Sequence, residues 1–327
     1  MDLYGTGILD GLDHTIAHEI TQLYDKPLKY CRLSHLQVAV EKSSSEMIGL
    51  ADGNRFPSLR EWKVAAEKLQ ENNAAAVILY PENGMRANIW KKAPLEVATL
   101  VASPSATAAV LISRDLFSQE LSQLNAADDF QDPLWSVLHN SAKADRLMAL
   151  PSAISCHWKD EELPELAPDH PARGLNWLKA AIQECCSDTE LGTPLKRTLL
   201  RAGLFQLHDF LNESHEASQS IEGNVQGDHW HAIMHRREPD YGNSKYWYRH
   251  VGSTSIFIDL NDWALRLRKE LPVNSVTNEQ IGAGTQWDPF SFVDFCSNCE
   301  RNRNQEAVKL ARQIQYLEML LLLQTTL

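Results

Sequence analysis

Histidines gather in one part of this chain, among arginines, carboxylates and large aromatic side chains. Six of the twelve histidines lie in the stretch from His208 to His250. Imidazole binds transition metals, and its ordinary pKa near neutrality suits it to proton transfer. This density of reactive groups exceeds what a solvated surface or an apolar core requires, so we predict a functional site here.

Helical phase sorts the cluster into two faces. His208 and His215 are seven residues apart, and His231 and His235 are four apart with Glu238 three further on. Residues at these spacings share one face of a helix. Two facing helices that each present imidazoles and a carboxylate are a recurrent way to build a divalent-metal site in a helical bundle.

The cluster predicts specific roles. The predicted metal ligands, which would also line a ligand pocket, are His208, His215, His231 and His235. Acid/base chemistry would use His231 and His235, with Glu213 or Glu238 as the general base. The candidate cofactor is a divalent metal.

Basic residues next to the histidines indicate an anion. Arg236 and Arg237 follow His235 directly, and Lys245 lies on the next predicted helix. Guanidinium forks suit carboxylate or phosphate, so a small polar or anionic molecule is the predicted partner. The alternative is that the arginines pair inside the fold, with carboxylates such as Glu213, Glu216, Glu238 and Asp240.

Three interpretations of the cluster stay open: a metal site, a metal-free site for a polar ligand, and a purely structural hydrogen-bond network. The chain contains no His-Glu-x-x-His motif. Ser214 and Ser218 lie close to histidines, but no Gly-x-Ser-x-Gly elbow surrounds them, so a nucleophilic triad is not supported.

Bulk properties exclude several classes of protein. The net charge of −12 argues against nucleic-acid binding. No apolar run approaches the roughly 20 residues that span a bilayer, and Asp2 and Asp10 do not fit a secretory signal. The six cysteines show no disulfide framework, and Cys296-x-x-Cys299 lacks the second pair of a zinc site. We therefore expect a cytoplasmic protein with reduced thiols.

The apolar pattern predicts an α+β fold. Helices are expected over residues 9–24 and 58–70, and strands over 33–40, 74–80 and 107–113. Beyond residue 174 the pattern becomes helical, with a helix start at Thr193-Pro194. The predicted organisation is a small α/β domain (1–150), a linker (151–173) and a helical bundle domain that carries the histidines (174–327).

Two resemblances concern the helical part. Residues 207–221 and 230–249, with 286–296, resemble a family of uncharacterised bacterial proteins with more distant fungal relatives. These share a His-x-Ile-Met-His-Arg-Arg-Glu-x-Asp-x-x-Asn-x-Lys-Tyr-Trp core, and the likeness spans roughly residues 195–325. It implies relatedness and carries no mechanism with it. Residues 238–248 also resemble the turn and second helix of one tetratricopeptide-like hairpin.

The sequence thus leads to two hypotheses about function. In the first, the helical domain holds a histidine- and arginine-lined pocket for a small polar or anionic ligand, as a metal-dependent or acid/base enzyme would. In the second, the motif is structural and the chain is an interaction protein. Its partner would then dock on the Leu-rich C-terminal helix, through an exposed apolar run at residues 319–323.

Overall fold

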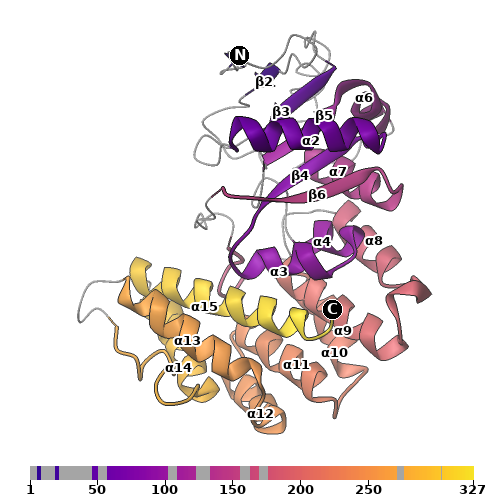
Figure 1. Ribbon diagram of the computed structural model, residues 1–327. Helices are drawn as coiled ribbons and strands as arrows, with labels where there is room; N and C mark the ends of the chain where they lie inside the picture. The colour runs from indigo at the N-terminus through magenta and orange to yellow at the C-terminus, as the bar shows by residue number, and fades with distance from the viewer. Residues whose placement is uncertain are drawn as a thin grey trace. The chain divides into compact units, whose positions relative to one another are not determined.

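The chain divides into two compact units. In the computed structural model the described residues are 6–8, 19–21, 46–50, 57–101, 109–122, 133–154, 163–168, 176–270, 276–302 and 304–327. The sheet unit comprises Met1–Trp158 with Leu175–Leu178, and the helical unit comprises Lys159–Gly174 with Lys179–Leu327. The predicted fold class, a sheet with helices followed by a mainly helical region, is confirmed (Figure 1).

The sheet unit is built on a mixed sheet. Among the described residues its strand order is β1-β2-β3-β5-β4-β6. The strands are β1 (Thr6–Ile8), β2 (Glu19–Thr21), β3 (Met47–Leu50), β4 (Ala76–Pro81), β5 (Ala109–Ser113) and β6 (Leu147–Ser152). β5 runs antiparallel to β3 and β4, whereas β4 and β6 are parallel. β4 is buried along its whole length, as its apolar run predicts.

Helices cover this sheet. They are α2 (Leu59–Glu71), α3 (Met85–Lys92), α4 (Leu95–Val101), α6 (Arg114–Ser122) and α7 (Pro133–Lys143). Ser58 and Glu61 form a capping box that begins α2. Glu61 also accepts hydrogen bonds of 2.7 Å from the Ser152 hydroxyl and the Ala153 amide, which tie α2 to the end of β6. Helix α2 lies against β4 and β5 (Figure 1). Its Trp62 belongs to the core cluster that includes residues of both strands.

The elements expected from the apolar pattern are confirmed at α2, β4 and β5. The helix expected over residues 9–24 is wrong where the chain is described, because Glu19–Thr21 is strand β2 and pairs with β1 and β3. Strand pairing overrides a local helical period there. The expected strand over 33–40 lies outside the described residues.

The helical unit contains a short 3-10 helix, η4, and a succession of α-helices, with α8 leading into it. Their bounds are α8 (Asn176–Cys185), η4 (Thr189–Leu191), α9 (Pro194–Leu207), α10 (Leu211–Gln219), α11 (Val225–Arg237), α12 (Tyr241–Val251), α13 (Ile256–Lys269), α14 (Pro289–Asn302) and α15 (Gln305–Gln324). α9 begins as predicted, with Thr193 accepting a hydrogen bond from the Lys196 amide and Pro194 in the first turn. α15 lies beside α13 and α14 (Figure 1).

Two successive helical hairpins in this unit share one construction. The Ser214 hydroxyl of α10 donates 3.0 Å back to the Ala202 carbonyl of α9, and the Ser244 hydroxyl of α12 donates 2.8 Å back to the Ala232 carbonyl of α11. The equivalent residues are thirty positions apart, and burial along α10 and α12 follows the same pattern. The sequence indicated a single tetratricopeptide-like hairpin at α11–α12. The structure shows that α9–α10 shares its serine contact and its burial pattern with α11–α12.

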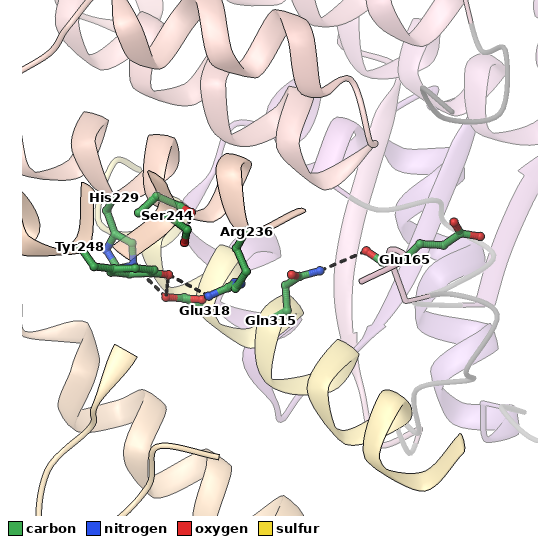
Figure 2. A network of polar contacts seen from close by, with 8 residues as sticks. Glu165, His229, Arg236, Ser244, Tyr248, Gln315 and Glu318 are labelled. Atoms are coloured by element: carbon green, nitrogen blue, oxygen red, sulfur yellow. Dashed lines mark hydrogen bonds and ion pairs between the residues drawn. The ribbon is translucent and has the colours of Figure 1, made fainter. Parts of the chain in front are cut away.

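Part of the stretch expected as a linker is bound to the helical unit. Strand β6 already extends to Ser152, and the described segment 163–168 lies along α15. Arg312 donates to the carbonyls of Leu163 and Pro164. Gln315 donates 3.1 Å to the carbonyl of Glu165, as Figure 2 shows. Side-chain donors thus hold this extended segment by its backbone.

A glycine sets how closely α9 can approach its neighbours. A Cβ on Gly203 would lie 2.6 Å from the Trp230 ring of α11 and 2.9 Å from Leu323 of α15. Glycine inside a helix ordinarily costs about 0.5–1 kcal/mol relative to alanine. Here that cost is offset because only glycine allows the three helices to pack at this distance.

We expect Gly203→Ala to lower the free energy of unfolding by about 1–3 kcal/mol, the usual cost of overpacking a core. Gly242→Ala is the matched control. The nearest atom to its new Cβ would be 3.8 Å away, so the change should be neutral or stabilising by up to about 1 kcal/mol. Urea denaturation of both variants measures the difference. Equal stability of the two variants would contradict the tight α9 contact.

Candidate metal centre

Helices α10 and α11 bring three histidines together: His215, His231 and His235. The ring centroids are 4.7 Å apart for His215 and His231, 5.1 Å for His215 and His235, and 4.8 Å for His231 and His235. One ligand nitrogen from each ring lies within 4.8 Å of the others. This three-histidine group could hold a metal ion.

His208, the fourth predicted ligand, is not a member of this group. The prediction treated His208 and His215 as residues of one helix. The chain instead leaves α9 at Leu207, turns through Asp209 with a φ of 62°, and starts α10 at Leu211. A seven-residue spacing places side chains on one face only within a continuous helix, so the turn separates the two histidines.

His231 is the most enclosed member of the group. Its side chain is 2% exposed, and neither ring nitrogen has a hydrogen-bond partner among the described residues. The Trp247 ring of α12 stacks on it, with centroids 3.9 Å apart and planes 18° from parallel. Burial, and then the neighbouring His235 and His215, lower the pKa of His231 to about 3. The ring is therefore neutral, with at least one lone pair available.

His235 has polar neighbours on both sides of its ring. Its Nδ1 atom lies 3.3 Å from a carboxylate oxygen of Glu238. Its Nε2 atom lies 3.0 Å from the side-chain amide nitrogen of Asn243. Burial lowers the pKa of His235, and the charge of Glu238 opposes that shift. A carboxylate on one ring nitrogen is the usual device that fixes the tautomer of a metal-binding histidine.

The opposite face of α11 holds a separate buried network (Figure 2). Glu318 of α15, which is fully buried, pairs with Arg236 at 2.7 Å. It also accepts 2.7 Å from the Tyr248 hydroxyl and lies 2.9 Å from Nε2 of His229. Arg236 in turn donates 2.8 Å to Tyr248 and stacks over the Phe292 ring at 4.7 Å. The charge of Arg236 is thus neutralised inside the protein.

Arg237 is equally enclosed. Its guanidinium pairs with Asp209 and donates to the backbone carbonyls of Gln206 and Glu165. Both arginines of the motif are at most 1% exposed. Both arginines therefore pair inside the fold, Arg236 with Glu318 and Arg237 with Asp209, and are not placed as the predicted clamp for an anion. Internal pairing was the alternative that the sequence left open, but the partners are not the nearby carboxylates named for it.

Two further predicted site residues are engaged in ion pairs. Glu213 of α10 pairs with Lys179, and Lys245 of α12 pairs with Asp294 of α14 at 2.7 Å. Glu238 differs, because its 38% exposed carboxylate lies beside His235. Of the carboxylates predicted as general bases, Glu238 is the one next to the histidine group.

Other features of the helical unit lie outside the histidine group. Residues 319–323 are buried, so the apolar run expected as an exposed docking surface is core. Burial raises the pKa of the Cys299 thiol to about 12 and raises that of Cys296 further, which argues against reactive cysteines. A hollow of about 580 Å³ opens beside Cys299, Phe295 and Asn298, and none of the predicted site residues lines it.

Comparisons of the chain with protein-family models, curated proteins and solved structures give no match. No helix within the described residues is long and apolar enough to cross a membrane. The site must therefore be interpreted from its own geometry.

Glu318 should control stability in a pH-dependent way. Burial would raise the pKa of this carboxyl group, but Arg236, His229 and Tyr248 together lower it from 4.5 to about 2. The stabilisation is therefore fully present above about pH 4.5 and is lost as the pH falls towards 2. Glu318→Gln leaves the buried charge of Arg236 without a counter-charge, which should cost about 3–5 kcal/mol near neutral pH.

Denaturant unfolding at several pH values tests this. The difference in unfolding free energy between wild type and Glu318→Gln should narrow as the pH is lowered. Glu306→Gln, at an exposed position in the first turn of the same helix, should change stability by less than about 0.5 kcal/mol. A Glu318→Gln difference that stays constant down to about pH 3 would contradict the assignment of a lowered pKa.

Proposed function

We propose that the helical unit binds one divalent transition metal of the zinc class at His215, His231 and His235, and that a fourth position on the metal can take a small polar ligand. The observation that carries this proposal is the buried ring of His231, whose two nitrogens lack hydrogen-bond partners among the described residues. Leaving a buried polar atom unsatisfied costs about 1–3 kcal/mol. A metal on this ring would remove much of that cost.

The chemistry of the three side chains supports zinc or a similar ion. Imidazole suits zinc, copper, nickel and iron, and three protein ligands with a free fourth position are typical of catalytic zinc. Nitrogens bound at about 2.0–2.1 Å in a tetrahedral site lie roughly 3.3 Å apart. The ligand nitrogens lie within 4.8 Å of one another, so side-chain movements of about an ångström would close the site.

The neighbouring charges limit the ligand. Because Arg236 and Arg237 are neutralised by Glu318 and Asp209, the metal itself would supply the positive charge that attracts an anionic or polar group. Glu238 would hold the tautomer of His235 through Nδ1, and its exposed carboxylate is the better-supported general base, since Glu213 pairs with Lys179. An acid/base enzyme is the extension of this proposal.

A second candidate function applies to the other half of the motif. The network of His229, Arg236, Tyr248 and Glu318 is buried and joins α11, α12 and α15, which supports a structural role for these residues. We propose that the motif combines this structural face with the metal-binding face. We also propose that residues 195–325 are related to the bacterial and fungal family that shares the motif.

Titration of the chelator-stripped protein with Zn²⁺ should show one equivalent bound, measured by isothermal titration calorimetry. His215→Ala should weaken binding by more than about 100-fold, because loss of outer-shell partners alone costs 10- to 100-fold. His215 is half-buried, so its removal should disturb the core less than removal of His231.

His208→Ala is the matched control. It removes a half-buried histidine of the same unit that does not belong to the group, and binding should stay within about 3-fold of wild type. Stoichiometric binding that survives in His215→Ala, or no stoichiometric binding by the wild-type protein, would overturn the proposed site.

A further inference from the structure

The side chain of Asn243 lies at the three-histidine group without a role in the proposed function so far. It is the third residue of α12, and its backbone amide donates 3.1 Å to the N-cap residue Asp240. The side chain of Asp240 thus caps the helix through the backbone amide of Asn243, and the half-buried side chain of Asn243 is left to contact His235.

The contact with His235 is not a strong hydrogen bond. The amide nitrogen lies 3.0 Å from Nε2 and also 3.5 Å from Nδ1 of the same ring. An atom on the lone-pair axis of one ring nitrogen cannot be this close to the other, so the amide lies beside the ring. Hydrogen bonds weaken steeply away from the lone-pair direction. The Nε2 lone pair therefore stays available while the amide is close by.

The side-chain amide of Asn243 can present either its NH₂ group or its carbonyl oxygen to the histidine group. The oxygen and nitrogen of an asparagine amide are nearly isosteric and exchange places on a half-turn about the last side-chain bond. Glu238 faces Nδ1 of His235, which leaves Nε2 as the metal-binding atom, and Nε2 is also the atom nearest to Asn243. A cation on Nε2 repels the amide NH₂ group and attracts the carbonyl oxygen.

We propose that Asn243 is a displaceable fourth ligand, an inference that rests on the proposed metal site. Its carbonyl oxygen occupies the fourth position in the resting state, and an incoming small anion or water takes that place. A neutral amide oxygen is a weaker donor to a zinc-class ion than an imidazole nitrogen, so it yields first. Asn243 thus sets how readily the site opens, and the three histidines retain the ion.

The test uses the full chain loaded with Co²⁺, whose visible absorption reports the coordination of the ion, and azide as the small anion. Asn243→Ala should weaken Co²⁺ binding by about 10-fold and strengthen azide binding, because the fourth position is free. Asn243→Asp, which replaces the amide by a charged carboxylate of the same shape, should strengthen Co²⁺ binding and weaken azide binding. All variants are measured at the same pH of about 8, because metal binding by imidazole depends on pH.

Asn212→Ala provides the matched control, since Asn212 is an exposed residue at the start of α10. The Asn212→Ala protein should bind both Co²⁺ and azide as the wild-type protein does. Metal-free melting temperatures show whether each variant folds. If wild type binds one Co²⁺ and all the variants match it for both ions, Asn243 is not a ligand and the three-histidine site stands. If wild type binds no Co²⁺, the proposed function itself fails.

Discussion

The helical unit depends on one buried carboxylate. Glu318 lies near the middle of α15 and, with α11 and α12 around it, meets a guanidinium, a phenol and an imidazole. A buried charge is tolerable only when it is paired and hydrogen-bonded, so these partners fix the rotation of α11 about its axis. His229 and Arg236, seven residues apart, must face α15. His231 and His235 then point away from Glu318, to the side where α10 supplies His215.

The features that can be predicted from the sequence are those that depend on the spacing of residues within one helix or strand. The common face of His231 and His235, the start of α9 at Thr193-Pro194 and the buried strand β4 all follow from period, capping chemistry and apolar runs. The partners of Arg236 and Arg237 do not, because Glu318 and Asp209 are brought to them by tertiary packing. One local error also mattered: treating residues 208–215 as a continuous helix hid the turn at Asp209 and wrongly placed His208 with His215.

The two hairpins show why a structural repeat can be undetectable in the amino-acid sequence. What α9–α10 and α11–α12 share is a buried serine that bonds back to an alanine carbonyl, together with a common pattern of burial. The other side chains at equivalent positions differ, as His215 and Lys245 do. Serine and alanine are too common to reveal a period by themselves. The backbone geometry repeats, and outside the shared serine and alanine it leaves the side chains free to differ.

That freedom bears directly on the site. Position 215 carries an imidazole that faces His231 and His235, and the equivalent position 245 carries a lysine that pairs with Asp294 of α14. Because Asp294 neutralises Lys245, the contact between α12 and α14 needs no further ligand. Three imidazoles offer one another no such compensation, and the nitrogens of His231 have no other described partner. A buried arrangement that is costly without a ligand and inexpensive with one is what a binding site requires. The histidine group differs in this respect from the structural network on the other face of α11, whose charges are paired within the protein.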